Sequence, residues 1–147
     1  MITATTITGV GIIDSGVTLM ARVRGHNGAL ITQASLTAIT YTVRNLTLAT
    51  TVTSAQSLTV SSVIFDSLQQ GDTSWDVDSA AEPGRDGSWG YNFRATIPAS
   101  HFGTFHVESI TPYRVTNHEF QIDVLFDPVT GEDFRQPFRF KALATWP

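Results

Sequence analysis

The chain has 147 residues, of which 41% are hydrophobic and only 15% are charged, and its formal net charge at pH 7 is −4. This length and hydrophobic content fit one globular domain and argue against intrinsic disorder. Nine basic residues are scattered along the chain, which disfavours nucleic-acid binding because several phosphates must be neutralised on one face. The absence of cysteine excludes disulfides and thiolate metal sites.

The first segment, residues 1–16, opens with a Thr-rich alternating run from Ile2 to Gly9. We expect either an edge strand of the chain's own sheet or an arm that adds to a neighbour's sheet, and the edge strand is favoured. Ile2 and Ile7 are candidate partner contacts in both cases. The segment lacks a positive region followed by a continuous apolar run, so no signal peptide is expected, and no run approaches a membrane span.

Strong alternation of apolar and polar residues predicts strands at Val17–Arg24 and Leu36–Arg44. The segment that follows is rich in Thr, Ser and Val, and it predicts two further strands at Thr47–Thr53 and Ser57–Val63. The residues expected to face inward on the two alternating strands are Val17, Leu19, Ala21, Val23, Ile39, Tyr41 and Val43.

The C-terminal half shows the same period. Tyr91–Ile97 predicts a strand that ends before Pro98, because proline cannot donate to the ladder. Residues 98–102 are expected to form one helical turn. Residues 120–126 and 134–140 flank a turn that contains Pro and Gly, so they predict a hairpin, with Pro137 at an edge or a bulge. The expected inward residues are Tyr91, Phe93, Ala95, Ile97, Phe120, Ile122, Val124 and Phe126.

Short alternating strands at this spacing, without a convincing helix, predict an all-β fold. We expect a single immunoglobulin-like antiparallel β-sandwich of about seven to eight strands that spans residues 1–147. One long irregular stretch, residues 69–90, interrupts it. Loops of this length inside compact domains are usually functional or disordered.

The loop at 69–90 is both aromatic and acidic, and its candidate partner-binding residues are Trp75, Asp76, Arg85, Trp89 and the adjacent Tyr91. Exposed aromatic residues can anchor a protein interface or stack on sugar rings. The structural alternative is that one tryptophan fills the core and the other fixes the loop to it. The acidic residues do not have the spacing of a twelve-residue calcium loop, so no metal is expected.

No catalytic motif stands out. The four histidines, His26, His101, His106 and His118, have no ligand spacing and no nucleophile motif beside them, so we expect no enzyme activity and no cofactor. Asn45-Leu-Thr47 has the form of a glycosylation sequon, which we interpret as chance because no signal peptide is expected.

Five segments together resemble a known class of module: residues 14–23, 28–36, 39–44, 91–98 and 126–134. Their order of polar turn, strand, Gly-bearing turn and a strand ending in Val-Arg, with closing strands of matching layout, resembles immunoglobulin-like modules of tailed-phage structural proteins. The N-terminal module of phage baseplate upper proteins has a similar layout. The aromatic loop departs from that pattern, and no functional residue of the family is carried over.

This resemblance implies a non-enzymatic virion protein, assembled in the host cytoplasm, that decorates a capsid or serves as a fibre or baseplate adaptor. Its partners would be the major capsid protein or tail and baseplate proteins, in many copies or as a homo-oligomer. Neither nucleic acid nor a membrane is an expected partner. The alternative is a carbohydrate-binding or adhesion module that meets a host surface glycan through Trp75, Trp89 and Tyr91.

Overall fold

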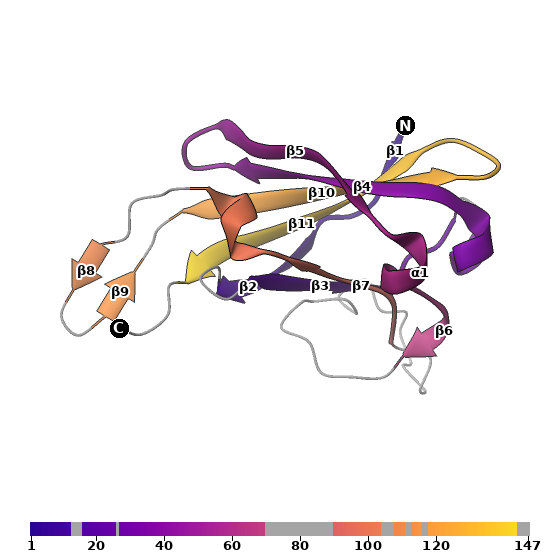
Figure 1. Cartoon of the computed structure of the whole chain (residues 1–147), viewed down its shortest axis with the longest axis horizontal. Coiled ribbons are helices and arrows are strands. Elements are labelled where there is room, and N and C mark those ends of the chain that lie inside the picture. Colours follow the sequence, from indigo (N-terminus) through magenta and orange to yellow (C-terminus); the bar gives the residue numbers. More distant parts are fainter. Residues whose placement is uncertain are drawn as a thin grey trace.

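The structure is a computed structural model that describes residues 1–12, 16–25, 27–69, 90–103, 108–110, 113–115 and 118–143. In this part of the chain two β-sheets pack face to face, and the helical elements are short turns (Figure 1). The strands are β1 (Ile2–Thr3), β2 (Ile7–Ile12), β3 (Val17–Ala21), β4 (Leu36–Asn45), β5 (Thr50–Leu58), β6 (Ile64–Gln69), β7 (Tyr91–Ile97), β8 (Glu108–Ile110), β9 (Tyr113–Val115), β10 (Glu119–Pro128) and β11 (Phe134–Leu143). The helical turns are η2 (Gln33–Ser35), α1 (Val60–Val63) and η3 (Ala99–Phe102).

The strand order has the immunoglobulin arrangement. The large sheet runs β1-β11-β10-β4-β5, with β2 also paired to β11, and the small sheet runs β3-β7-β6. With β3 as strand B of the immunoglobulin fold, β7 and β6 are strands E and D, so the small sheet has the order B-E-D. In the large sheet β11, β10 and β4 are strands G, F and C, and β5 is an added C′ strand. The predicted all-β sandwich is therefore confirmed. The β8–β9 ribbon, which alternation did not predict, lies at one end of the molecule (Figure 1).

The N-terminal segment pairs within its own chain. Both β1 and β2 run parallel to β11, so the sandwich is not purely antiparallel as expected. Thr3 pairs with Arg135, and Ile7 pairs with Phe138. The N-terminal segment therefore advances four residues where β11 advances three, so it contains one extra residue between β1 and β2. Pro137 lies opposite this break, where a residue without an N–H is tolerated. The predicted bulge thus belongs to the neighbouring strand, and β11 itself is interior to the sheet.

The core lies between the inner faces of the two sheets. All the predicted inward residues of β3, β4 and β10 are buried, and so are those of β7 except half-buried Tyr91. Met20, which alternation places on the opposite face of β3 from Leu19 and Ala21, is also buried. One cluster of rings at η3 shows the packing: Phe102 meets Phe120 and Phe140 edge to face, at centroid distances of 5.4 and 5.7 Å. Such pairs add stabilisation beyond the area that they bury.

The segment between Thr47 and Val63 differs from its prediction. A single strand, β5, replaces the two expected strands, and residues 60–63 form the helical turn α1. The pairing of β5 with β4 shifts register twice, and Ala55 adopts a φ of 51°, a left-handed value that is unusual for a residue with a side chain. Because β5 is an uncharged edge strand, these bulges protect it against pairing with another sheet.

One polar side chain inside the sandwich replaces part of a β-ladder. Asn92 is completely buried, and its amide bonds both backbone groups of Val23, accepting from the N–H at 2.7 Å and donating to the carbonyl at 2.9 Å. The same amide donates to the carbonyl of Ile31 at 2.9 Å. Three backbone groups beyond the end of β3 are therefore satisfied by one side chain.

Candidate docking face on the large sheet

Four of the residues singled out from the aromatic loop, Trp75, Asp76, Arg85 and Trp89, lie outside the residues that the structure describes. Tyr91 is described. It begins β7, is half-buried, and contacts Phe65 of β6 edge to face with ring centroids 5.8 Å apart. The two rings form a partly exposed aromatic pair where the small sheet meets the ends of the loop.

The two N-terminal candidates have different environments. Ile2 lies in β1, and 48% of its surface is exposed. Ile7 lies in β2 and belongs to the hydrophobic core, where it pairs with Phe138. The side chain of Ile7 therefore packs inside the chain's own sandwich, and its role as a partner contact stays a prediction.

The outer face of the large sheet holds a connected set of polar side chains among the described residues. Two rows cross the three central strands. In one row Arg44 of β4, Gln121 of β10 and Arg139 of β11 are direct neighbours, and in the next row Asp123 lies between Thr42 and Pro137. Residues alternate between the two faces of a strand, so these side chains all point away from the aromatic core.

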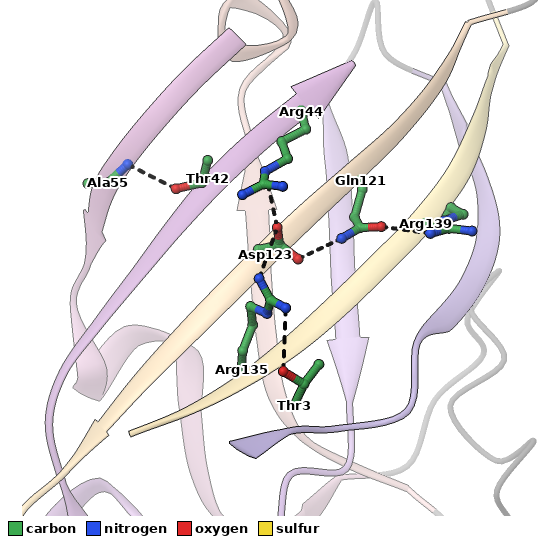
Figure 2. Close-up of polar contacts among 8 residues, drawn as sticks. All are labelled: Thr3, Thr42, Arg44, Ala55, Gln121, Asp123, Arg135 and Arg139. Carbon is green, nitrogen blue, oxygen red and sulfur yellow. Dashed lines mark hydrogen bonds and ion pairs between the residues drawn. The ribbon is translucent and has the colours of Figure 1, made fainter. Parts of the chain in front are cut away.

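A single carboxylate holds this set together, as Figure 2 shows. Arg44 Nε lies 3.5 Å from Asp123 Oδ2, and Arg135 Nη1 approaches the same oxygen from the other side at 3.9 Å. Gln121 donates from Nε2 to Asp123 Oδ1 at 2.8 Å, and Arg139 donates from Nη2 to Gln121 Oε1 at 3.0 Å. We call Arg44, Gln121, Asp123, Arg135 and Arg139 the arginine cluster.

Asp123 is the buried centre of the arginine cluster. Its side chain is only 6% exposed although it projects from the outer face, whereas those of Arg44 and Arg135 are 49% and 34% exposed. The long arginine side chains cover the carboxylate and keep their charged ends in solvent. The arginine cluster contains three cations and one anion, so it has a positive excess of two charges on a chain of net charge −4.

The arginine cluster is not recognisable in the linear sequence, in which its members are spread from position 44 to position 139. A partial signal existed, because alternation places Gln121 and Asp123 on the polar side of their strand. The predicted hairpin would also place Asp123 near Pro137. The contribution of Arg44 requires the pairing of β4 with β10, which is a long-range contact.

The other described surfaces show fewer features of a binding site. An open depression of about 580 Å³ lies beside η2 and α1, and its lining includes Gln33, Thr59 and Asp66 but no aromatic ring on which a sugar could stack. Asp66 already accepts the backbone N–H of Gln33 at 2.7 Å. Within the described ranges, no three His, Cys, Asp or Glu side chains gather in an arrangement that could bind a metal ion.

The sequon asparagine is a structural residue. Asn45 is 2% exposed, its Oδ1 accepts the N–H of Leu48 at 3.0 Å, and its Nδ2 lies 2.8 Å from His118 Nδ1. A buried amide with both atoms engaged cannot serve as a glycan acceptor without local unfolding. This geometry agrees with a chance sequon.

Comparison of the chain with protein-family models, with curated proteins and with solved structures finds no match. The interpretation of the arginine cluster therefore depends on its own geometry. None of the helices in the described part of the chain is long and apolar enough to cross a membrane.

The β10–β11 hairpin contains a pair of like charges, and this gives a first prediction. Desolvation, the charge of Asp133 and a hydrogen bond with Asp133 raise the pKa of Asp127. A raised pKa in the folded state means that protonation favours folding, so the free energy of unfolding falls as pH rises from about 4 through the raised pKa. We expect Asp127→Asn to remove this dependence and to raise the Tm at pH 7 by about 1–2 °C.

Thermal unfolding of both proteins between pH 3.5 and pH 7 would measure this difference. Asp66→Asn is the control, since Asp66 is an exposed aspartate whose described partner is a backbone N–H rather than another acid. A constant difference in Tm between wild type and Asp127→Asn across that range would contradict the prediction.

Proposed function

We propose that this protein is a non-enzymatic structural component of a tailed phage or phage-like particle, and that it docks on a capsid or tail lattice through the outer face of its large sheet. The sequence resemblance to immunoglobulin-like modules of phage structural proteins supports the class of protein. The arginine cluster supports the manner of docking.

The arginine cluster carries this proposal because it is a preorganised contact surface. Asp123 lies within ion-pair distance of Arg44 and Arg135, and Gln121 accepts a hydrogen bond from Arg139, so the three side chains are partly ordered and less side-chain entropy is lost when a partner binds. Arginine is enriched in protein interfaces and among the residues that dominate their binding energy. The rest of the chain is poor in charge, which suits a protein whose surface is partly covered by partners.

The proposed partners are the major capsid protein or the tail and baseplate proteins. A protein that binds the assembled lattice and not its separate subunits stabilises that lattice by mass action. Many copies on one particle would also bind more strongly together than any single contact allows, through avidity.

The proposal predicts that density-purified particles from the source culture contain this chain. Quantitative mass spectrometry should find it together with the major capsid protein. A ratio near one copy per capsid subunit, or a simple fraction of it, would indicate capsid decoration, and a few copies per particle would indicate a tail or vertex position. Its absence from purified particles would refute the virion assignment.

One observation favours a second candidate, a carbohydrate-binding or adhesion module. Phe65 and Tyr91 are both partly exposed and touch each other, so they could offer a ring to a host surface glycan. A glycan array would separate the two candidates. Reproducible sugar binding that is lost in Tyr91→Ala, with the fold retained, would favour the adhesion module.

A further inference from the structure

The arginine cluster has an orientation that indicates the chemistry of its partner. Arg44 contacts Asp123 through Nε, and among the described residues its two terminal nitrogens have no acceptor. Arg139 uses Nη2 to bind Gln121 and has no other acceptor in the same part of the chain. A guanidinium group has five N–H donors. Both arginines therefore retain donors that no described residue satisfies and that a partner could engage.

The spacing of these donors is set by the sheet. Arg44 and Arg139 lie in one row on either side of Gln121, two strand spacings apart, which is about 10 Å at the backbone. Figure 2 shows both side chains extending from this row. A partner that engages both arginines therefore contacts side chains that start from strands on either side of Gln121.

Carboxylates suit this arrangement better than a run of phosphates. The arginine cluster already contains one carboxylate, Asp123, against two guanidinium groups, so its geometry accommodates that anion. The paired geometry of a guanidinium group matches a carboxylate through two parallel hydrogen bonds. A polyanion such as a nucleic acid would meet an excess of only two positive charges on a chain of net charge −4.

We propose that the outer face of the large sheet binds an acidic protein surface through its carboxylates, with Arg44 and Arg139 as the contacts and Asp123 as the positioning residue. This inference builds on the proposed docking function, and it specifies the chemistry of the partner surface. The contact is electrostatic and partly exposed, so it weakens as salt rises.

The test uses the full chain and labelled poly-L-glutamate as the probe, with binding followed by fluorescence anisotropy. At about 20 mM salt we expect Arg44→Gln/Arg139→Gln to bind about tenfold more weakly than wild type, and wild-type binding to be lost at about 300 mM salt. Arg94→Gln is the matched control, because Arg94 is an exposed arginine on β7 of the small sheet, and its binding should equal that of wild type.

The only lysine of the chain gives a second readout. Lys141 is exposed on β11, two residues beyond Arg139 and on the same face. A carbodiimide should therefore couple its amine to carboxylates of bound poly-L-glutamate, and Lys141→Arg should lose this product. Cross-linking in the wild type should decrease in Arg44→Gln/Arg139→Gln by a factor similar to that of binding.

The inference is overturned if the double variant binds poly-L-glutamate as tightly as wild type, or if Arg94→Gln loses as much affinity. It is also overturned if inorganic polyphosphate binds and poly-L-glutamate does not. If the double variant does not fold, Arg139→Gln decides, because Arg139 is exposed and its described contact is Gln121. Particle mass spectrometry tests the docking function separately, since a chain absent from particles could still show this carboxylate preference.

Discussion

Replacing Asn92 with alanine is expected to lower the free energy of unfolding by about 3–5 kcal/mol. The side chain is fully buried and makes three hydrogen bonds, to the N–H and carbonyl of Val23 and to the carbonyl of Ile31. Its removal would leave the N–H of Val23 and the carbonyl of Ile31 without this partner, while the carbonyl of Val23 would still accept the N–H of Ile31 at 3.0 Å. Each orphaned group costs about 1–3 kcal/mol. Domains of this kind are stable by only about 5–15 kcal/mol, so the variant should be close to unfolding.

Urea unfolding of wild type and variants would measure this loss. Asn92→Asp is the informative companion, since it keeps the acceptor for the Val23 N–H but places a carboxylate against two carbonyl oxygens, and it should be at least as unstable as Asn92→Ala. Asn27→Ala is the control. Asn27 accepts the Ala29 N–H in an exposed turn, so its loss should cost less than about 1 kcal/mol. Similar midpoints for Asn92→Ala and Asn27→Ala would contradict this account.

The role of Asn92 also shows where inference from sequence stops. Alternation correctly predicted β7 and the inward direction of Phe93, because a strand with one buried face repeats every two residues. The burial of Asn92 has a different origin. It arises from the segment between Val23 and Ile31, which lies more than sixty residues earlier in the chain and covers the side of β7 that alternation assigns to solvent.

The region around β5 was predicted least well for a related reason. Its residues are nearly all Thr, Ser, Ala and Val, so no apolar period distinguishes a strand from a bend or a helical turn. Its bulges and the turn α1 are set by pairing with β4 and by burial of Val63. The alternating strands β3, β4, β7, β10 and β11 were predicted because each carries its own signal.

The candidate site follows the same rule. The sequence pointed to aromatic residues in one continuous loop, because a local composition can be read along the chain. The arginine cluster depends on the register of three strands, which brings Arg44 within reach of Asp123 far later in the chain. Each of its arginines looks like an ordinary solvent-facing residue until the strands are paired.

Asp123→Asn is the substitution that should affect both the fold and the docking face. Asparagine keeps the shape and an acceptor for Gln121, but it removes the charge between Arg44 and Arg135. Loss of one member of a fully buried ion pair typically costs about 3–5 kcal/mol. The two arginines are a third to a half exposed, so solvent screening reduces the expected loss to about 1–3 kcal/mol.

The cause of the stability loss in Asp123→Asn can be identified by measuring that loss at different salt concentrations and in combination with Arg44→Gln. If repulsion between Arg44 and Arg135 is responsible, the loss should shrink at high salt, and Arg44→Gln should restore stability to Asp123→Asn while destabilising the wild type. A loss that is the same at all salt concentrations, and unaffected by Arg44→Gln, would instead assign the role of Asp123 to its hydrogen bond with Gln121. In that case the arginines would not be positioned by the carboxylate. Poly-L-glutamate binding by Asp123→Asn would then match that of wild type, because both arginines would keep their orientation without it.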